Sequence, residues 1–284
     1  MIINPETIFT VGADPEMFIV NKKTGEVVSS IGIIPGEKGA PWVDPSWPDG
    51  FGIEIDNILV EYNIPPARSK DQFVSYIEFM KSYISDFVAK INPDYTILCA
   101  SSRMVPEAEL NNPIAQLFGC CPDFNCYTGN PNPRPKGDKT NLRSAGFHVH
   151  YGYEEPNIDQ SVEMVKYFDV FLGLMSLLFD TDRKRRSLYG KAGCYRLTSY
   201  GVEYRTLSSK MAETPEMVAL IYDGVCAATQ AYERHIPIPN STNVVDAINN
   251  SDVNAAKYIL NTFRKSIRED LFAYAYLTKL VNLK

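Results

Sequence analysis

Alternating polar and apolar positions predict strands along much of the chain. Valine, isoleucine, tyrosine and threonine are frequent in these stretches, as is typical of strands. Residues 8–20 indicate one strand with a break at 12–15, or two strands, and residues 22–25 indicate a hairpin turn into a strand at 26–29. The other predicted strands are residues 51–63, 95–100, 147–153 and 202–207.

Other stretches have the period of a helix. Ser69 and Gln72 have the spacing of a capping box, and apolar residues then recur on one face as far as Ile91, which predicts a helix. Residues 159–179 are apolar nearly all round, which is typical of a buried helix. The remaining predicted helices cover residues 215–234, a stretch after residue 251, and residues 264–281.

The order of these elements favours an α+β fold. Strands often follow strands without a helix between them, which favours a curved, mainly antiparallel sheet with helices on its convex face over a doubly wound sheet. The glycine-rich phosphate-binding motifs of nucleotide folds are missing. We expect one domain over residues 1–284, with 210–284 as its C-terminal helical portion. Residues 106–143 predict a long polar loop, which in a compact domain is usually functional or disordered.

Composition narrows the class of protein. The chain has 284 residues, 45% of them hydrophobic, which is enough for a large core, and its net charge of -6 argues against nucleic acid as the main partner. Neither a signal peptide nor a stretch able to span a bilayer is evident, so we expect a cytoplasmic protein whose six cysteines are reduced. Cys120, Cys121 and Cys126 lack the pairing of a zinc ribbon and are interpreted as packing or loop residues.

Charged side chains occupy alternating positions on four predicted strands. Each pair alone has an ordinary interpretation: a turn, an edge charge, a structural histidine, or a solvated strand face with a cross-strand salt bridge. Together, however, carboxylates packed on one face would repel one another without cations. Oxygen ligands with one or two imidazoles suit magnesium or manganese better than zinc. The pairs are Asp14 with Glu16, Asp56 with Glu61, His148 with His150, and Glu203 with Arg205.

Arginines form a complementary set. The basic run of residues 183–186 follows the predicted buried helix, and the helix dipole accounts for part of it. Arg196 and Arg205 lie instead in the segment that contains Glu203. Their guanidinium groups could therefore clamp a phosphoryl group or a substrate carboxylate.

The order of these segments resembles a known family. Residues 12–18, 56–66, 145–150, 186–190 and 193–205 are similar to the carboxylate–amine ligases of type 2, often phage-encoded. That family shares a catalytic domain with glutamine synthetase and glutamate–cysteine ligase. The chain departs from the larger enzymes because Asp14 stands where glutamine synthetase usually has glutamate. We also expect no separate N-terminal domain of the kind those enzymes have, and the 106–143 segment matches nothing in the pattern.

The resemblance implies a set of site residues. The ligands that it implies for two or three magnesium (or manganese) ions are Asp14, Glu16, Glu61, His148 and Glu203. Asp56 is added to this set because of the alternation of charges alone. The residues that the resemblance implies as contacts to ATP or an acyl phosphate are Arg186, His150, Arg196 and Arg205. The residues expected to act in catalysis are Glu203, Arg205 and Arg196.

We therefore expect an ATP-dependent ligase that joins a carboxylate to an amine through an acyl phosphate. Its substrates would be small molecules or peptides, its location the host cytoplasm if it is phage-encoded, and a homo-oligomer is left open. One alternative is a metal-dependent hydrolase in which His148, His150 and acidic ligands activate water. Another is a non-catalytic binding protein that keeps the fold.

Overall fold

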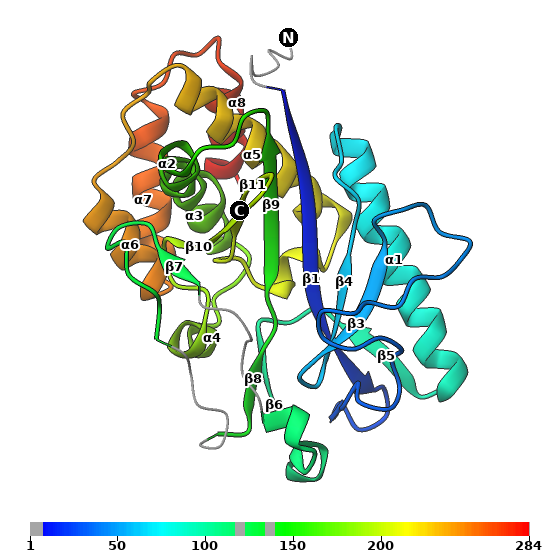
Figure 1. Cartoon of the computed structure of the whole chain (residues 1–284). Helices are drawn as coiled ribbons and strands as arrows, with labels where there is room; N and C mark the ends of the chain where they lie inside the picture. Colours follow the sequence, from blue (N-terminus) through cyan, green and yellow to red (C-terminus); the bar gives the residue numbers. More distant parts are fainter. Residues whose placement is uncertain (1–7, 117–122, 134–139, 284) are drawn as a thin grey trace.

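An open antiparallel sheet forms the centre of the molecule (Figure 1). The computed structural model describes residues 8–116, 123–133 and 140–283. Within these residues, nine strands form the main sheet in the order β3-β4-β1-β9-β11-β10-β7, and β2 and β5 both pair with β1. Strands β6 and β8 form a separate pair. The observed fold is therefore α+β with a mainly antiparallel sheet, as the sequence predicts.

Strands dominate the first half of the chain and helices the second. The strands are β1 (Phe9–Asn21), β2 (Val27–Val28), β3 (Gly52–Asp56), β4 (Leu59–Asn63), β5 (Tyr95–Leu98), β6 (Ser102–Met104), β7 (Phe124–Asn125), β8 (Leu142–Ser144), β9 (Phe147–Tyr153), β10 (Cys194–Thr198) and β11 (Gly201–Tyr204). The helices are α1 (Lys70–Ile91), α2 (Ile158–Phe168), α3 (Leu174–Ser176), α4 (Arg183–Leu188), α5 (Pro215–Glu233), α6 (Ser241–Asn249), α7 (Val253–Arg264) and α8 (Phe272–Val281).

Strand β1 runs without the break predicted at residues 12–15. It pairs with β9 at every position from Phe9, opposite Tyr153, to Pro15, opposite Phe147. Glycine and proline favour a turn locally, but this long-range pairing overrides that preference. The continuous strand carries Asp14 into the middle of the sheet.

The predicted helices are largely confirmed. Ser69 caps α1 by accepting a hydrogen bond from the Gln72 amide, and α5 begins at Pro215 as predicted. The helix predicted over 159–179 is wrong in detail, because a π-helical turn at Asp169–Gly173 separates α2 from α3. Helix α6 was not predicted.

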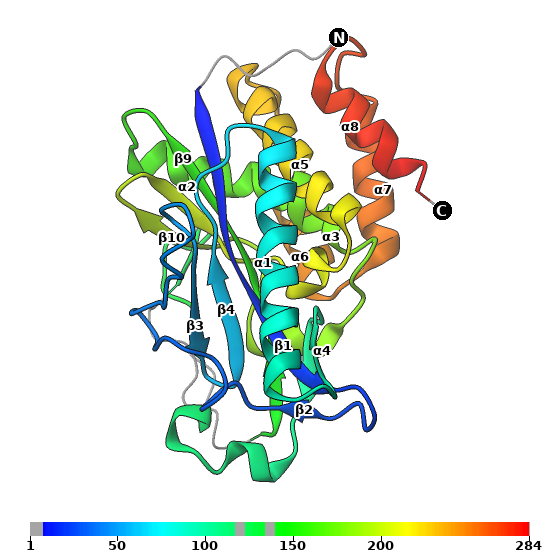
Figure 2. The ribbon, with the colours of Figure 1, turned by 90° about the vertical axis from the view of Figure 1, so that its right-hand side faces the viewer.

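Helices cover one face of the sheet (Figure 2). On β1, Val11 and Ala13 point to that face and join the main apolar core, which also contains Phe73 of α1. Side chains alternate along a strand, so the intervening residues Asp14 and Glu16 point to the opposite, open face. The same alternation on the neighbouring strands leaves the open face for polar side chains.

Part of the 106–143 segment covers one end of the open face. Phe18 and Val20, further along β1, pack there in a smaller apolar cluster with Ile58, Leu110 and Ala145. The segment is therefore not a plain loop in its described parts: it contains two 3₁₀ turns, β7 and the start of β8.

The structure bears on two expectations from composition, the role of the neighbouring cysteines and the lack of a membrane span, within the described residues. Cys120 and Cys121 lie outside the described residues, whereas Cys126 is buried as a free thiol. Among the described helices, none has the length and apolar character needed to cross a membrane.

Candidate active site on the open face of the sheet

The sheet register lines up the charged positions of four neighbouring strands. Asp14 of β1 lies directly opposite His148 of β9. Glu203 of β11 lies opposite both His150 of β9 and Arg196 of β10. These side chains share the open face, because the alternate residues of each strand belong to the apolar core. The register therefore assembles a polar site from strands far apart in the sequence.

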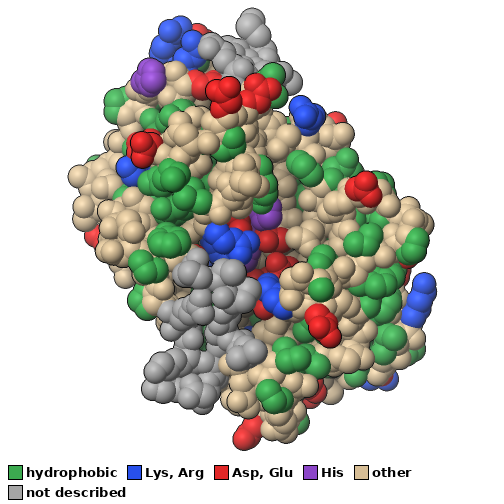
Figure 3. Space-filling model, in the orientation of Figure 1, with side chains coloured by type: hydrophobic (Ala, Val, Ile, Leu, Met, Phe, Trp, Pro, Cys, Tyr) green, Lys and Arg blue, Asp and Glu red, His purple; other side chains and the backbone are tan. Residues whose placement is uncertain are grey.

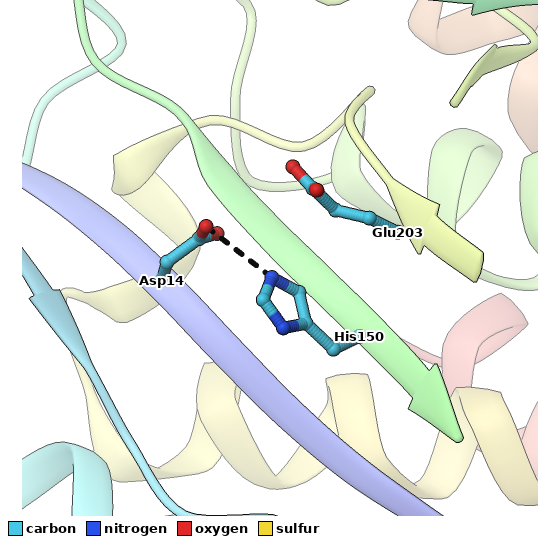
Figure 4. A group of neighbouring side chains, drawn as sticks. All are labelled: Asp14, His150 and Glu203. Atoms are coloured by element: carbon cyan, nitrogen blue, oxygen red, sulfur yellow. Dashed lines mark ion pairs between the residues drawn. The ribbon is translucent and has the colours of Figure 1, made fainter. Parts of the chain in front are cut away.

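The first group is the imidazole cluster, made of Asp14, His148, His150 and Glu203. His150 Nε2 lies 3.2 Å from Asp14 Oδ2, and His148 Nδ1 lies 3.1 Å from Asp14 Oδ1. One ligand atom each from Asp14, His150 and Glu203 lies within 4.8 Å of the others (Figure 4). This spacing would allow the three side chains to coordinate one cation.

Unsatisfied polar atoms support a cation at the imidazole cluster. Asp14 Oδ1, His148 Nδ1 and His150 Nε2 are buried, and none makes a well-formed hydrogen bond within the described part of the chain. Buried polar atoms are rarely left without a partner. Burial acts to raise the pKa of Asp14, but the two imidazoles hold that pKa well below its usual range. The Asp14 side chain is therefore a carboxylate anion.

Two arginines already contact Glu203, which is fully buried. Arg196 Nε and Nη2 lie 2.6 and 2.5 Å from Glu203 Oε2, and Arg205 Nη1 contacts Oε1. The cross-strand salt bridge of the ordinary interpretation is thus present, but its carboxylate is fully buried while its guanidinium groups are partly exposed. Burial acts to lower the pKa of Arg205, and Glu203 overcomes this and raises it. Both guanidinium groups consequently stay charged beside the cluster.

The second group is the carboxylate cluster, made of Glu16, Glu54, Asp56 and Glu61. Glu61 of β4 lies directly opposite Glu16 on one side and Glu54 on the other. Like charges directly opposite one another destabilise a sheet. One carboxylate oxygen each from Glu16, Asp56 and Glu61 lies within 4.8 Å of the others, so this cluster also has the spacing of a cation site.

A lysine from the loop before β3 enters the carboxylate cluster. Lys38 Nζ lies 2.8 Å from Asp56 Oδ2 and 3.6 Å from Glu54 Oε1, and it also contacts Glu61 Oε2. Burial and then the charge of Asp14 raise the pKa of Glu61, while Lys38 opposes that rise. Lys38 therefore neutralises only part of the cluster's negative charge.

His148 links the two clusters at the edge of a cavity. Its Nδ1 lies 3.5 Å from Glu203 Oε1, and its Nε2 lies 4.0 Å from Glu16 Oε1. The cavity has a volume of about 60 Å³ and is lined by residues of both clusters together with Arg205. Figure 3 shows the hollow on this face, where acidic and basic side chains lie close to a histidine. A small charged group would fit at this point.

The basic run at residues 183–186 has a different role from the one predicted. It does not end the preceding helix but forms α4, which Asp182 caps by accepting a hydrogen bond from Lys184 N. The Arg185 guanidinium donates to the carbonyls of Thr206 and Leu207, and Arg186 donates to Thr206. Buried carbonyls need such donors, which gives both arginines a structural role; Arg185 in addition lines the cavity beside the two clusters.

The structure thus unites most, but not all, of the predicted site residues. Asp14, Glu16, Asp56, Glu61, His148, His150, Arg196, Glu203 and Arg205 share the open face. Arg186 does not line the cavity, so its contact with ATP stays a prediction without a geometric basis. His150, expected to contact the cofactor, lies instead among the candidate metal ligands.

Two residues of the site, Lys38 and Tyr200, and one residue on the helix-covered side of the sheet, Asp169, carried little signal in the sequence. Lys38 lies in an irregular loop, so no period indicates where it points. Tyr200 lies in the tight turn between β10 and β11, which the sequence pattern does not resolve, and its hydroxyl is 2.9 Å from His150 Nδ1. Asp169, in the π-helical turn, accepts hydrogen bonds from the hydroxyls of Tyr127 and Tyr204. A polar residue inside an apolar helix was the only available hint.

Comparison with known families assigns the chain to a family. A family model described as phage phiEco32-like COOH.NH2 ligase, type 2, matches residues 139–280. The chain belongs to this family. No curated protein matches the chain. The ligase family match spans both histidines, Arg196, Glu203 and Arg205, whereas Asp14 and the carboxylate cluster lie outside it and join the site through the fold of the sheet. Membership of the family indicates a carboxylate–amine ligase.

Proposed function

We propose that the protein is an ATP-dependent ligase that forms an amide or peptide bond through an acyl phosphate. The observation that carries the proposal is the meeting of two candidate cation clusters and two arginines on one sheet face, in a chain of the ligase family. Phosphoryl transfer needs this combination of charges. Under the proposal, the sheet is a catalytic domain of the glutamine synthetase type.

The donor atoms fit divalent cations at the two clusters. Asp14, His150 and Glu203, with His148 beside them, would hold one ion, and Glu16, Asp56 and Glu61 would surround the second position. The all-oxygen set suits magnesium or manganese. A bound cation would neutralise charge on the transferring phosphoryl group.

The chain's own cations would act beside the metal. In the first step, a substrate carboxylate oxygen attacks the γ-phosphorus of ATP, and the bond to ADP breaks. Arg205 lines the cavity, and both it and Arg196 would present fixed donors where negative charge develops. The amine, in its neutral form, then attacks the acyl carbon; the bond from that carbon to the phosphate oxygen breaks, phosphate leaves, and the nitrogen releases one proton to solvent.

A metal-dependent hydrolase is the second candidate. The observation that favours it is the contact of both His148 and His150 with Asp14, since imidazole ligands also suit zinc. That reaction needs no ATP and gives the arginines no part beyond pairing with Glu203.

Nucleotide binding separates the two candidates. Calorimetry with ATP should detect binding in magnesium and little binding in EDTA, and phosphate release should require a carboxylate and an amine together. Equal ATP binding in EDTA would argue against the ligase. Copurification of one equivalent of zinc, with activity that does not depend on ATP, would establish the hydrolase instead.

A further inference from the structure

The loop before β3 is built to place Lys38 among the carboxylates. Trp42 and Ile53 exchange backbone hydrogen bonds of 2.8 and 2.9 Å, which fix the loop to the edge of the sheet. Gly36 has a φ of +87°, and a Cβ there would collide with the Ile53 carbonyl. Gly39 N donates a 2.9 Å hydrogen bond to Glu54 Oε2. The position of Lys38 therefore follows from the backbone.

Lys38 lies where a cation of the carboxylate cluster would bind. Its ammonium group contacts Asp56 and Glu61, which with Glu16 have the spacing of a metal site. An ammonium group donates its hydrogens to the same lone pairs that a divalent ion needs. Magnesium requires oxygen ligands at about 2.0–2.1 Å, and the ammonium group lies in contact with both carboxylates, so an ion placed between them would meet its bulk and its positive charge.

The neighbouring cluster has no such occupant. Asp14 Oδ1, His148 Nδ1 and His150 Nε2 make no hydrogen bond within the described residues, so these three atoms can bind an ion without the displacement of a side chain. Glu203 would share its two oxygens with Arg196 and Arg205. The two clusters therefore differ in what a metal must do to enter.

We propose that Lys38 is a tethered cation that excludes a divalent ion from the carboxylate cluster of the free enzyme. The number of ions bound in the absence of substrates is then set by this one side chain: one ion at the imidazole cluster, and a second only when Lys38 withdraws. The inference rests on the proposed function in one respect, that both clusters have the donors for divalent ions.

The test counts bound manganese by electron paramagnetic resonance, without ATP or substrates. Wild type should bind one ion tightly, Lys38→Met should bind two, and Lys38→Arg, which keeps the charge, should bind one. Lys23→Met is the matched control, because Lys23 pairs with Asp94 at an exposed position away from both clusters. It should bind one ion, as wild type does.

Two further measurements keep the test decisive. Asp56→Asn removes a ligand of the carboxylate cluster and should still bind one ion, because the ion of the wild type lies at the imidazole cluster. This result can be obtained even if Lys38→Met folds poorly. Manganese should raise the melting temperature of Lys38→Met more than that of wild type, because ligand binding stabilises the folded state. Two ions in wild type, or the same count in Lys38→Met, would overturn the proposal. No ion in wild type and one in Lys38→Met would support the role of Lys38 while contradicting the metal site of the proposed ligase.

Discussion

The imidazole cluster and the carboxylate cluster each take one carboxylate from β1, Asp14 and Glu16, but they obtain their positive charge in different ways. In the imidazole cluster, Arg196 and Arg205 come from or next to paired strands of the sheet, so their backbones are fixed by the register. In the carboxylate cluster, the cation is Lys38, which reaches in from the loop before β3 and not from a strand of the sheet. The arginines are thus held on or beside the strands that carry the cluster, whereas Lys38 depends on a separate loop, and the proposed exchange concerns its side chain alone.

This difference also appears in the acidity of the carboxyl groups. The pKa of Asp14 is held well below its usual range by imidazoles that overcome burial, whereas burial and neighbouring carboxylates raise the pKa of Glu61 despite Lys38. A site with surplus negative charge is ready to accept a further cation. The comparison teaches that two carboxylates two residues apart on β1, Asp14 and Glu16, can belong to clusters whose negative charge is balanced to different degrees.

Replacement of Glu203 should have the largest effect. Glu203→Gln leaves Arg196 and Arg205 without their carboxylate at a buried position, and loss of one partner of a buried pair costs about 3 kcal/mol or more. The variant should also lose manganese affinity at the imidazole cluster and most turnover. Urea unfolding and manganese titration measure these effects. Wild-type stability in this variant would show that the arginines do not depend on Glu203.

Arg205→Lys should reduce turnover strongly while folding is kept. Lysine retains the charge but loses the planar fork that fits two phosphate oxygens. Loss of a preorganised donor costs about 10²–10³ in rate, and ATP affinity should change less than turnover. The assay is phosphate release, with circular dichroism as the check on folding. A near wild-type rate would remove the phosphoryl role of Arg205.

The free energy of unfolding should depend on pH through Asp169, which accepts a hydrogen bond from Tyr204 of β11, the strand that carries Glu203. Burial raises the pKa of this carboxyl to about 7. Since its unfolded pKa is near 3.9, the folded state holds the proton longer, and stability should fall as the pH rises towards 7. Between pH 5 and 8 the loss should be about 3 kcal/mol.

The matched variant for this effect is Asp169→Asn, whose side chain does not ionise. Its free energy of unfolding, measured in urea at several pH values, should lack this component of the pH dependence. If wild type and Asp169→Asn lose stability in parallel over this range, another group is responsible.

Glu61→Gln should have the smallest effect on stability. Lys38 keeps its contacts with Asp56 and Glu54, and removal of one carboxylate relieves repulsion among the others. We expect a loss of about 1 kcal/mol or less, comparable to one ordinary hydrogen bond. Urea unfolding beside Glu203→Gln tests the comparison directly. A loss as large as that of Glu203→Gln would mean that both clusters are equally fixed.

The sequence was informative where a short period determines direction. Residues 147–153 alternate between apolar side chains and the two histidines, so their strand and the shared face of His148 and His150 could be predicted. The π-helical turn at Asp169 could not, because it interrupts an apolar stretch with no local break. Lys38 could not be assigned to the site either, since its position depends on the fixed loop geometry at Gly36 and on pairing between Trp42 and Ile53.

The most direct test of the ligase proposal is mass spectrometry of a cell extract incubated with the enzyme, ATP and magnesium. We predict a new product whose mass equals that of two metabolites minus water, formed in step with phosphate release and absent with Glu203→Gln. A product that has instead gained water, or phosphate release without any condensed product, would contradict the proposed carboxylate–amine ligation.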